Sequence, residues 1–175
     1  MDKRKEANLR VKRNIVRALT ELMQKKNYSD ISVSEITALA GVSRISYYRN
    51  YDSKEDILTE SLESLMTHFS EEINPLPLHT PSRRVMSRFF HVAREEKDHF
   101  MLLHQAGMDS QLQNGLDEFI LSCPHFPSLD RRRIYPAYLF SGALFRLLIR
   151  WYDNDMNEND TELANIFCQY MAGLL

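Results

Sequence analysis

Residues 32–55 read SVSEITALAGVSRISYYRNYDSKE, and this stretch decides the fold. Ser32 is followed three residues later by Glu35, which is the spacing of a capping box. In such a box the serine oxygen accepts the backbone N–H of the third helical residue, and the glutamate accepts the N–H of the serine. The pattern predicts a short helix over residues 33–40, which Gly41 ends.

A second short helix is expected directly after a tight turn. Ser43 is placed to cap a helix from Arg44 to about Asn50. A capped helix, a glycine turn and a helix of about two turns form the helix-turn-helix layout, whose second helix enters the major groove of DNA. Tyr47 is expected to pack inward with Tyr51, which leaves the opposite face of this helix free.

Apolar residues recur at three- and four-residue spacing through most of the remaining chain, which is typical of helices. A first helix containing Ile15 and Leu19 is expected to end near Asn27, and Ser53 is placed to cap a long fourth helix. The stretch 74–81 holds three prolines and predicts a linker. Further helices are expected over residues 82–96, 98–106, 109–122, 130–153 and 159–174, with Pro136 near the start of the fourth of these.

These elements predict an all-α chain in two parts. Residues 1–52 form a three-helix helix-turn-helix head, and the long fourth helix joins it to a C-terminal helical bundle within residues 53–175. Residues 1–51 hold eleven Lys and Arg against five Asp and Glu, a net charge of +6, whereas residues 52–175 carry −8. A basic head on an acidic body is the distribution expected if one end of the molecule binds phosphates, with chance variation of a 50-residue window as the alternative.

Other classes of protein find little support in the composition. No apolar run approaches the ~18 residues of a membrane span, and the N-terminus MDKRKEANLRVKR lacks the apolar core of a secretory signal. Two cysteines, Cys123 and Cys168, make neither a disulfide framework nor a zinc site, so a cytoplasmic location is expected. Glu96 and His99 form an E-x-x-H step, but a di-iron site needs a second copy, and none exists. We expect no metal, no cofactor and no enzymatic activity.

The same stretch resembles the DNA-binding segment of the TetR/AcrR family of transcriptional regulators. Members typically show a Thr- or Ser-capped helix followed by A-G-V-S-x-x-x-[FY]-Y-x-[HY]-F-x-[ST]-K-E. The matching positions are Ala40, Gly41, Val42, Ser43, Tyr47, Tyr48, Tyr51, Ser53, Lys54 and Glu55. Asn27, Asn50 and Tyr51 stand where Gly, His and Phe are common. The resemblance covers about the first third of the chain.

The resemblance implies roles for individual residues. Tyr48 corresponds to a family tyrosine whose hydroxyl binds a phosphate, and Lys54 to a lysine that pairs with a phosphate at the start of the fourth helix. Arg44 corresponds to a base-reading position, although a phosphate contact is an equal alternative for it. The residues expected at DNA are Ser32, Ser34, Ser43, Arg44, Ile45, Ser46, Tyr48, Asn50 and Lys54.

In this family the C-terminal helices enclose an effector cavity and the last two helices form a dimer interface. A homodimer through those helices is therefore expected, reading a palindromic operator in double-stranded DNA. Candidates for the lining of an effector pocket, each with plain core packing as the alternative, are Phe69, Phe89, Phe90, Phe100, Met101, His104, Phe119 and Tyr138.

The resulting hypothesis is a dimeric, sequence-specific DNA-binding regulator that acts as a repressor. Its release by a small-molecule effector stays open, since some members of the family resembled have no such effector. The alternative is a helical protein-interaction adaptor, or an activator subunit, whose DNA-binding head is vestigial or depends on a partner.

Overall fold

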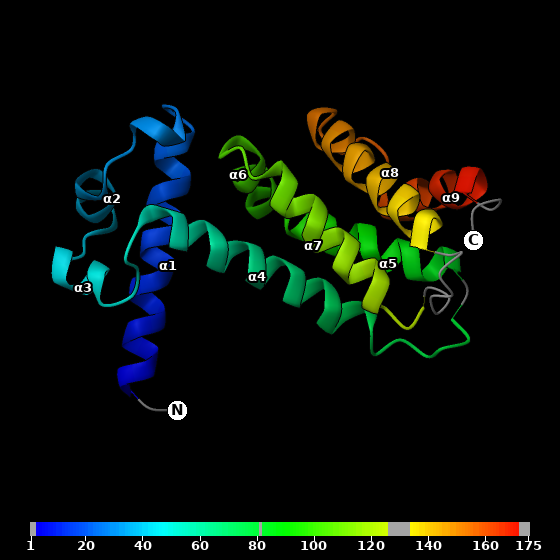
Figure 1. Cartoon of the computed structure of the whole chain (residues 1–175), viewed down its shortest axis with the longest axis horizontal. Coiled ribbons are helices and arrows are strands. Elements are labelled where there is room, and N and C mark those ends of the chain that lie inside the picture. The colour runs from blue at the N-terminus through cyan, green and yellow to red at the C-terminus, as the bar shows by residue number, and fades with distance from the viewer. Residues whose placement is uncertain (1–2, 81, 126–133, 172–175) are drawn as a thin grey trace. The chain divides into compact units, whose positions relative to one another are not determined.

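A computed structural model describes residues 3–80, 82–125 and 134–171. Within these ranges it contains nine α-helices, one 3₁₀ helix and no strand, so the predicted all-α class is confirmed (Figure 1). The elements in chain order are α1 (Lys3–Met23), η1 (Tyr28–Asp30), α2 (Val33–Ala40), α3 (Arg44–Tyr48), α4 (Lys54–Ile73), α5 (Ser82–Glu95), α6 (Lys97–Gln105), α7 (Asp109–Ser122), α8 (Ile134–Asp153) and α9 (Asp160–Met171).

The chain forms two compact units. The first comprises Met1–Ser61 with Gln105–Gly107, and the second comprises Leu62–His104 with Met108–Leu175. The division falls inside α4, whereas the boundary expected from the sequence lies just before this helix. No helix among the described residues is long and apolar enough to cross a membrane.

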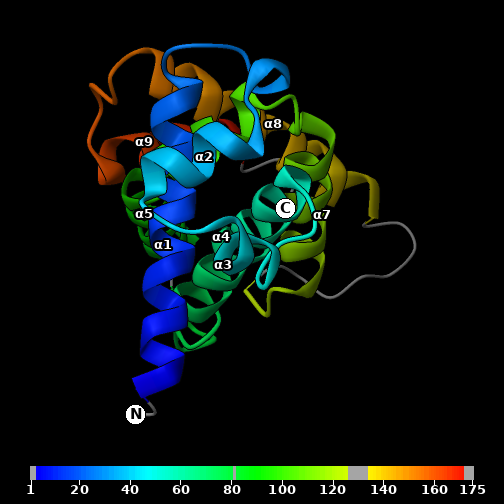
Figure 2. The same ribbon diagram turned by 90° about the vertical axis from the view of Figure 1, so that its left-hand side faces the viewer.

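The first unit packs α2 and α3 against α1 (Figure 2). Ile15 and Leu19 on α1 are fully buried, and so is Ile36 on α2. Each buried aliphatic side chain of this size stabilises the fold by roughly 1.5–3 kcal/mol relative to exposure. Because a core this small depends on a few such residues, the helix caps around it are a substantial part of its stability.

The second unit pairs α5 with α9 and α7 with α8. Its centre is aromatic: the ring of Phe90 lies 5.9 Å from that of Trp151 and 6.1 Å from that of Phe167, both edge-on. Aromatic rings at these separations contribute attraction beyond the area they bury.

Most of the differences from the expected elements lie at helix ends. The first helix ends at Met23, and Asn27 precedes η1 in an extended conformation. Pro136 lies in the first turn of α8, where the missing N–H has no partner to lose. Residues 130–133 and 172–174, expected to be helical, lie outside the described residues.

Candidate nucleic-acid interface

The N-terminus of α2 is held by the predicted capping box. Ser32 Oγ accepts the backbone N–H of Glu35, and a Glu35 carboxylate oxygen accepts the N–H of Ser32 at 2.9 Å. Lys26 Nζ donates to the other carboxylate oxygen at 2.6 Å. The hydrogen bond from Lys26, followed by those from Ser32, lowers the pKa of Glu35 to about 2. The helix therefore starts at a defined place with its serines exposed.

The turn between α2 and α3 depends on Gly41. Its backbone is left-handed, with φ 65° and ψ 34°, a conformation that side chains with a Cβ adopt rarely. The N–H of Val42 then returns to the carbonyl of Thr37 at 3.1 Å. Ser43 follows as the cap of α3, accepting the N–H of Ser46 at 3.1 Å. Local hydrogen bonds thus set the angle between the two helices.

Helix α3 has one buried and one exposed face. Tyr47 is completely buried, and its ring lies 5.9 Å from that of the buried Tyr51. Ile45 is 73% exposed and Tyr48 is 53% exposed. The predicted inward packing of Tyr47 with Tyr51 is therefore confirmed, and the facing side of α3 offers an aliphatic and a phenolic side chain to solvent.

The buried face of α3 carries the hydroxyl group of Tyr47. The Tyr47 hydroxyl accepts and donates no hydrogen bond among the described residues. Burial, followed by the neighbouring Tyr48, raises the pKa of Tyr47 to about 12. The ring of Tyr47 therefore serves packing, and its hydroxyl adds nothing to the core.

Two predicted site residues from different helices are brought together. The Arg44 guanidinium on α3 donates a hydrogen bond to Ser34 Oγ on α2, and both side chains are exposed. Beside them, the hydroxyls of Ser43 and Ser46 lie 2.9 Å apart. The interface residues of α2 and the start of α3 thus form one polar surface with a positive charge that can turn outward.

Asn50 and Lys54 are engaged by the protein itself. Asn50 Nδ2 donates to the carbonyl of Ser46 at 2.8 Å, which satisfies a free acceptor at the end of α3. Lys54 Nζ donates to the carbonyls of Tyr28, Ser29 and Ile31 at 2.8, 3.3 and 3.0 Å. An ammonium has three N–H donors, so these carbonyls take all of them. The predicted phosphate contact of Lys54 stays a prediction, and in the free protein its charge is directed inward.

Leu39 on α2 is 43% exposed although its side chain is apolar. The buried face of α2 is centred on Ile36, Thr37 and Ala40, and at 3.6 residues per turn Leu39 lies at its edge. A helical wheel centred on those three residues predicts the exposure of Leu39. Arg49, directly after α3, is exposed as well. Both extend the surface that α2 and α3 present.

The residues expected to line an effector pocket range from buried to exposed, and Met101 is half-buried. Five phenylalanines are buried, and the rings of Phe69, Phe89 and Phe119 contact one another at 4.8 to 6.1 Å between centroids. Tyr138 is exposed, and His104 Nδ1 lies 2.5 Å from a carboxylate oxygen of Asp109. The pocket lining stays a prediction, and a ligand among the phenylalanines would have to separate packed rings.

The two residues of the E-x-x-H step, Glu96 and His99, hydrogen-bond to each other. The Glu96 carboxylate lies between His68 and His99, with Nδ1 of each at 2.6 Å. Burial would raise the pKa of Glu96, but the hydrogen bonds with His99 and His68 outweigh it and lower that pKa. This cluster joins α4 to the junction of α5 and α6.

Comparison with known proteins finds a family model that matches the head. Residues 15–60 match the family model described as bacterial regulatory proteins, tetR family. The predicted resemblance is therefore confirmed over the head and the beginning of α4. No curated protein matches the chain at a significant level.

Solved structures share the fold over nearly the whole chain. Lin0861 from Listeria innocua has a TM-score of 0.76 and 13% identity, covering 100% of this chain and 94% of that one. A TetR transcriptional regulator from Streptococcus agalactiae 2603V has a TM-score of 0.70 and 17% identity, covering 96% of this chain and 97% of that one. A tetR-family transcriptional regulator from Streptomyces coelicolor has a TM-score of 0.61 and 20% identity, covering 93% of this chain and 81% of that one. At these identities the likeness shows the fold of such regulators.

Proposed function

We propose that this chain, whose head is of the tetR-family type, is a homodimeric, sequence-specific DNA-binding transcriptional regulator of the cytoplasm. The observation that carries the proposal is the division of α3 between a buried Tyr47 and the exposed Ile45 and Tyr48. A helix held rigidly on one face and open on the other is what insertion into the ~12 Å major groove requires.

The exposed side chains differ in the part of DNA they suit. Arg44 reads a guanine edge with its guanidinium or pairs with a phosphate, after exchanging its contact with Ser34. Ile45 contacts the methyl group of a thymine. The Tyr48 hydroxyl, together with the hydroxyls of Ser32 and Ser43, binds backbone phosphates. Asn50 and Lys54 support this surface from behind through their bonds to backbone carbonyls.

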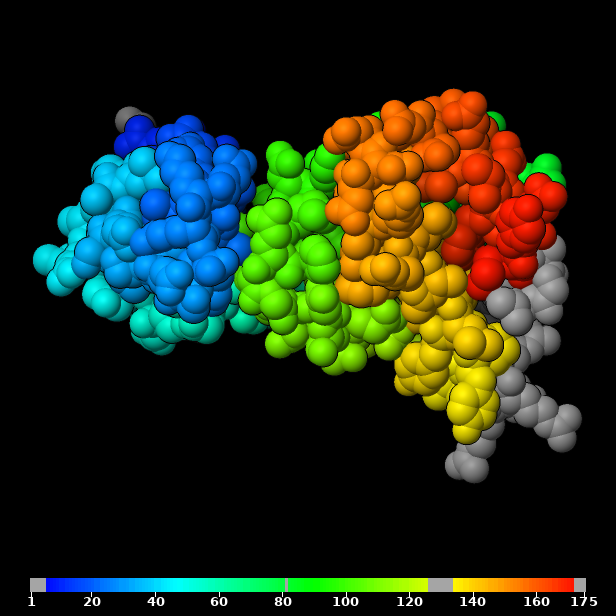
Figure 3. Space-filling view, turned by 90° about the horizontal axis from the view of Figure 1, so that it is seen from above, coloured from blue at the N-terminus to red at the C-terminus, as the bar shows by residue number. Residues whose placement is uncertain are grey.

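A two-fold operator requires two copies of α3, and the second unit carries a surface suited to pairing. Leu139 on α8 is 59% exposed and Tyr170 on α9 is 78% exposed. Tyr135 and Tyr138 lie on the same face of α8 as Leu139, and Ile166 lies one turn from Tyr170. Figure 3 shows the segments of α8, in yellow and orange, and of α9, in red, both at the surface of this unit. We assign this face to a second copy of the chain.

The assignment is tested by the mass of the particle in solution. Wild type should scatter light as a dimer, and Tyr170→Lys combined with Leu139→Lys should shift it to the monomer because two charges would be desolvated at each copy's contact. Gln169→Lys, on the neighbouring exposed position of α9, should leave the dimer intact. A dimer that survives the double substitution would place the interface elsewhere.

We further propose that the regulator represses, since occupation of a promoter needs no additional contact, and that an effector releases it by changing the spacing of the two heads.

The binding of a duplex is tested by its dependence on salt. The logarithm of the affinity should fall steeply with the logarithm of the salt concentration, by about 0.9 per phosphate contact. Tyr48→Phe and Arg44→Gln should weaken binding, whereas Arg17→Gln on the exposed surface of α1 should not. A chain that retards no duplex would favour the adaptor alternative.

A further inference from the structure

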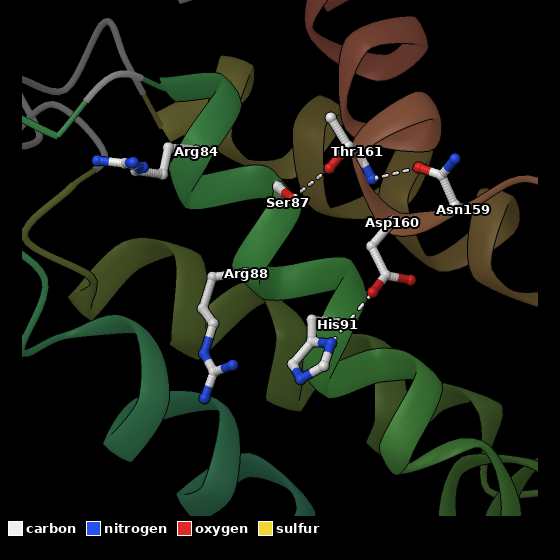
Figure 4. A pocket seen from close by; sticks show the side chains of 7 residues that line it. All are labelled: Arg84, Ser87, Arg88, His91, Asn159, Asp160 and Thr161. Carbon is white, nitrogen blue, oxygen red and sulfur yellow. Dashed lines mark hydrogen bonds and ion pairs between the residues drawn. The ribbon is translucent and has the colours of Figure 1, made fainter.

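An open groove of about 490 Å³ lies between α5 and the start of α9, within the second unit (Figure 4). Its walls are polar on both sides, and the hydroxyls of Ser87 and Thr161 lie 3.2 Å apart across it. The lining residues are Arg84, Ser87, Arg88, His91, Asn159, Asp160 and Thr161. None of them belongs to the predicted effector pocket.

The α5 side of this groove is basic, although the unit as a whole is acidic. Residues 82–94 hold four arginines and no Asp or Glu. Arg83 and Arg84 lie in the first turn of α5, at the positive end of its dipole, where cations are unfavourable. Charges kept where they oppose local stability are typical of a binding site.

The charges in the groove are unequally engaged. Asp160 is neutralised by Arg94, whose Nε lies 2.7 Å away, and it also contacts His91 at 3.1 Å. Arg84 is exposed and has no ion pair with any described residue. Arg88 forms an ion pair with Glu72 on α4, and this hydrogen bond lowers the pKa of Glu72. The excess charge available to a ligand is therefore positive.

The first turn of α9 is already capped. The Asn159 side-chain oxygen accepts the N–H groups of Thr161 and Glu162 at 3.1 and 3.0 Å. Binding in the groove must therefore use side chains, and Figure 4 shows Arg84 and Arg88 both extending from α5, with Ser87 between them along the helix.

We propose that this groove binds a small molecule that carries a phosphate group. Arg84 and Arg88 turn their guanidiniums into the groove by rotation about side-chain bonds and grip the phosphate oxygens, since the guanidinium fork matches phosphate geometry. Ser87 and Thr161 donate their hydroxyls to the same oxygens. The volume lies in the range of small-molecule sites, so it leaves room for the organic part of the ligand.

Occupation of the groove exchanges the partner of Arg88. When the phosphate takes this guanidinium, Glu72 in the last turn of α4 loses its ion pair. The ligand would therefore make different contacts in two arrangements of α4. An effector needs such a difference in order to shift the balance between two states. This regulatory consequence, unlike the binding itself, rests on the proposed function.

Isothermal titration of the 175-residue chain, without DNA, tests the binding. Ribose 5-phosphate should bind saturably, inorganic phosphate should compete with it weakly, and ribose should give no heat of binding. Arg84→Gln should weaken binding by about tenfold or more, the loss expected for a charge-assisted hydrogen bond. Arg83→Gln, an exposed neighbour on α5 outside the groove lining, should bind like wild type.

Glu72→Gln supplies a test in the opposite direction. Because it frees Arg88 from competition, it should tighten the binding of ribose 5-phosphate, again by about tenfold. Failure of both ribose 5-phosphate and inorganic phosphate to bind at up to about 10 mM, far weaker than ordinary effectors, would overturn the proposal. So would binding that Arg44→Gln abolishes and Arg84→Gln does not, because the phosphate would then sit on the head. Neither result depends on whether the chain binds DNA.

Discussion

Lys54 Nζ lies 2.8 Å from the carbonyl oxygen of Tyr28 and 4.3 Å from the centroid of its ring. The first residue of α4 thus closes over the turn η1, which precedes the first helix of the helix-turn-helix. Two further carbonyls, of Ser29 and Ile31, complete its shell. This ammonium holds the two chain segments that flank α2 and α3 in one place.

Replacement of Lys54 by methionine should therefore destabilise the head more than it changes DNA binding. We expect the free energy of unfolding to fall by roughly 2 kcal/mol, as for hydrogen bonds to a charged group. The salt dependence of duplex binding should keep its slope. Urea denaturation and salt titration measure the two quantities, with Lys25→Met as the exposed control. A slope shallower by about one unit would show that Lys54 turns to a phosphate in the complex.

Two adjacent tyrosines should respond oppositely to loss of the hydroxyl. Tyr47→Phe removes a buried hydroxyl that has no partner among the described residues, so stability should rise by roughly 1 kcal/mol while DNA affinity stays the same. Tyr48→Phe should leave stability within about 0.5 kcal/mol and weaken DNA binding by about tenfold. Thermal unfolding and fluorescence anisotropy separate the effects. Reversed behaviour would mean that α3 presents its other face.

Ile45 should read the methyl group of a thymine. If so, replacing one operator thymine by uracil should weaken the binding of wild type by about fivefold to tenfold. The same replacement should not affect Ile45→Ala, because the methyl group has then lost its partner. Since Ile45 is exposed in the free protein, the substitution should not change the unfolding temperature. Equal sensitivity of both proteins to uracil at every position would remove Ile45 from base reading.

The start of α2 should be sensitive to acid. The pKa of Glu35 lies at about 2 instead of 4.5, so its ionised form stabilises the fold above about pH 4.5. That stabilisation is lost as the pH falls toward 2. Between these values the unfolding temperature of wild type should fall more steeply than that of Glu35→Gln. Glu63→Gln, on the exposed side of α4, should follow wild type; parallel curves for Glu35→Gln and wild type would argue against the hydrogen bonds of Lys26 and Ser32.

The features that were predictable from sequence are those set by neighbours along the chain. The cap at Ser32 acts on the N–H three residues away, and the caps at Ser43 and Ser53 do the same. The inward face of α3 follows from the helical period, which separates Tyr47 from Tyr48. Local hydrogen bonds and periodicity need no knowledge of the tertiary fold.

What was not predictable depends on residues distant in sequence. Lys54 meets carbonyls 23 to 26 residues earlier, and Arg88 meets Glu72 on another helix. Phenylalanine at helical spacing is compatible with a packed core and with a cavity wall alike, so the sequence could not predict that the rings of Phe69 and Phe89 stack 4.8 Å apart. The groove on α5 was not predictable because its second wall, at the start of α9, lies about 70 residues further along the chain.

The central claim is that α3, from Arg44 to Tyr48, is presented twice to the edges of base pairs. Selection of bound duplexes from a random pool by the intact protein tests it most directly. We predict enrichment of a two-fold symmetric sequence with half-sites about 10 base pairs apart, or a multiple of that spacing, and altered preference at a symmetric pair of positions for Arg44→Gln or Ile45→Ala. Recovery of no common sequence, or of one that both variants select unchanged, would contradict the account.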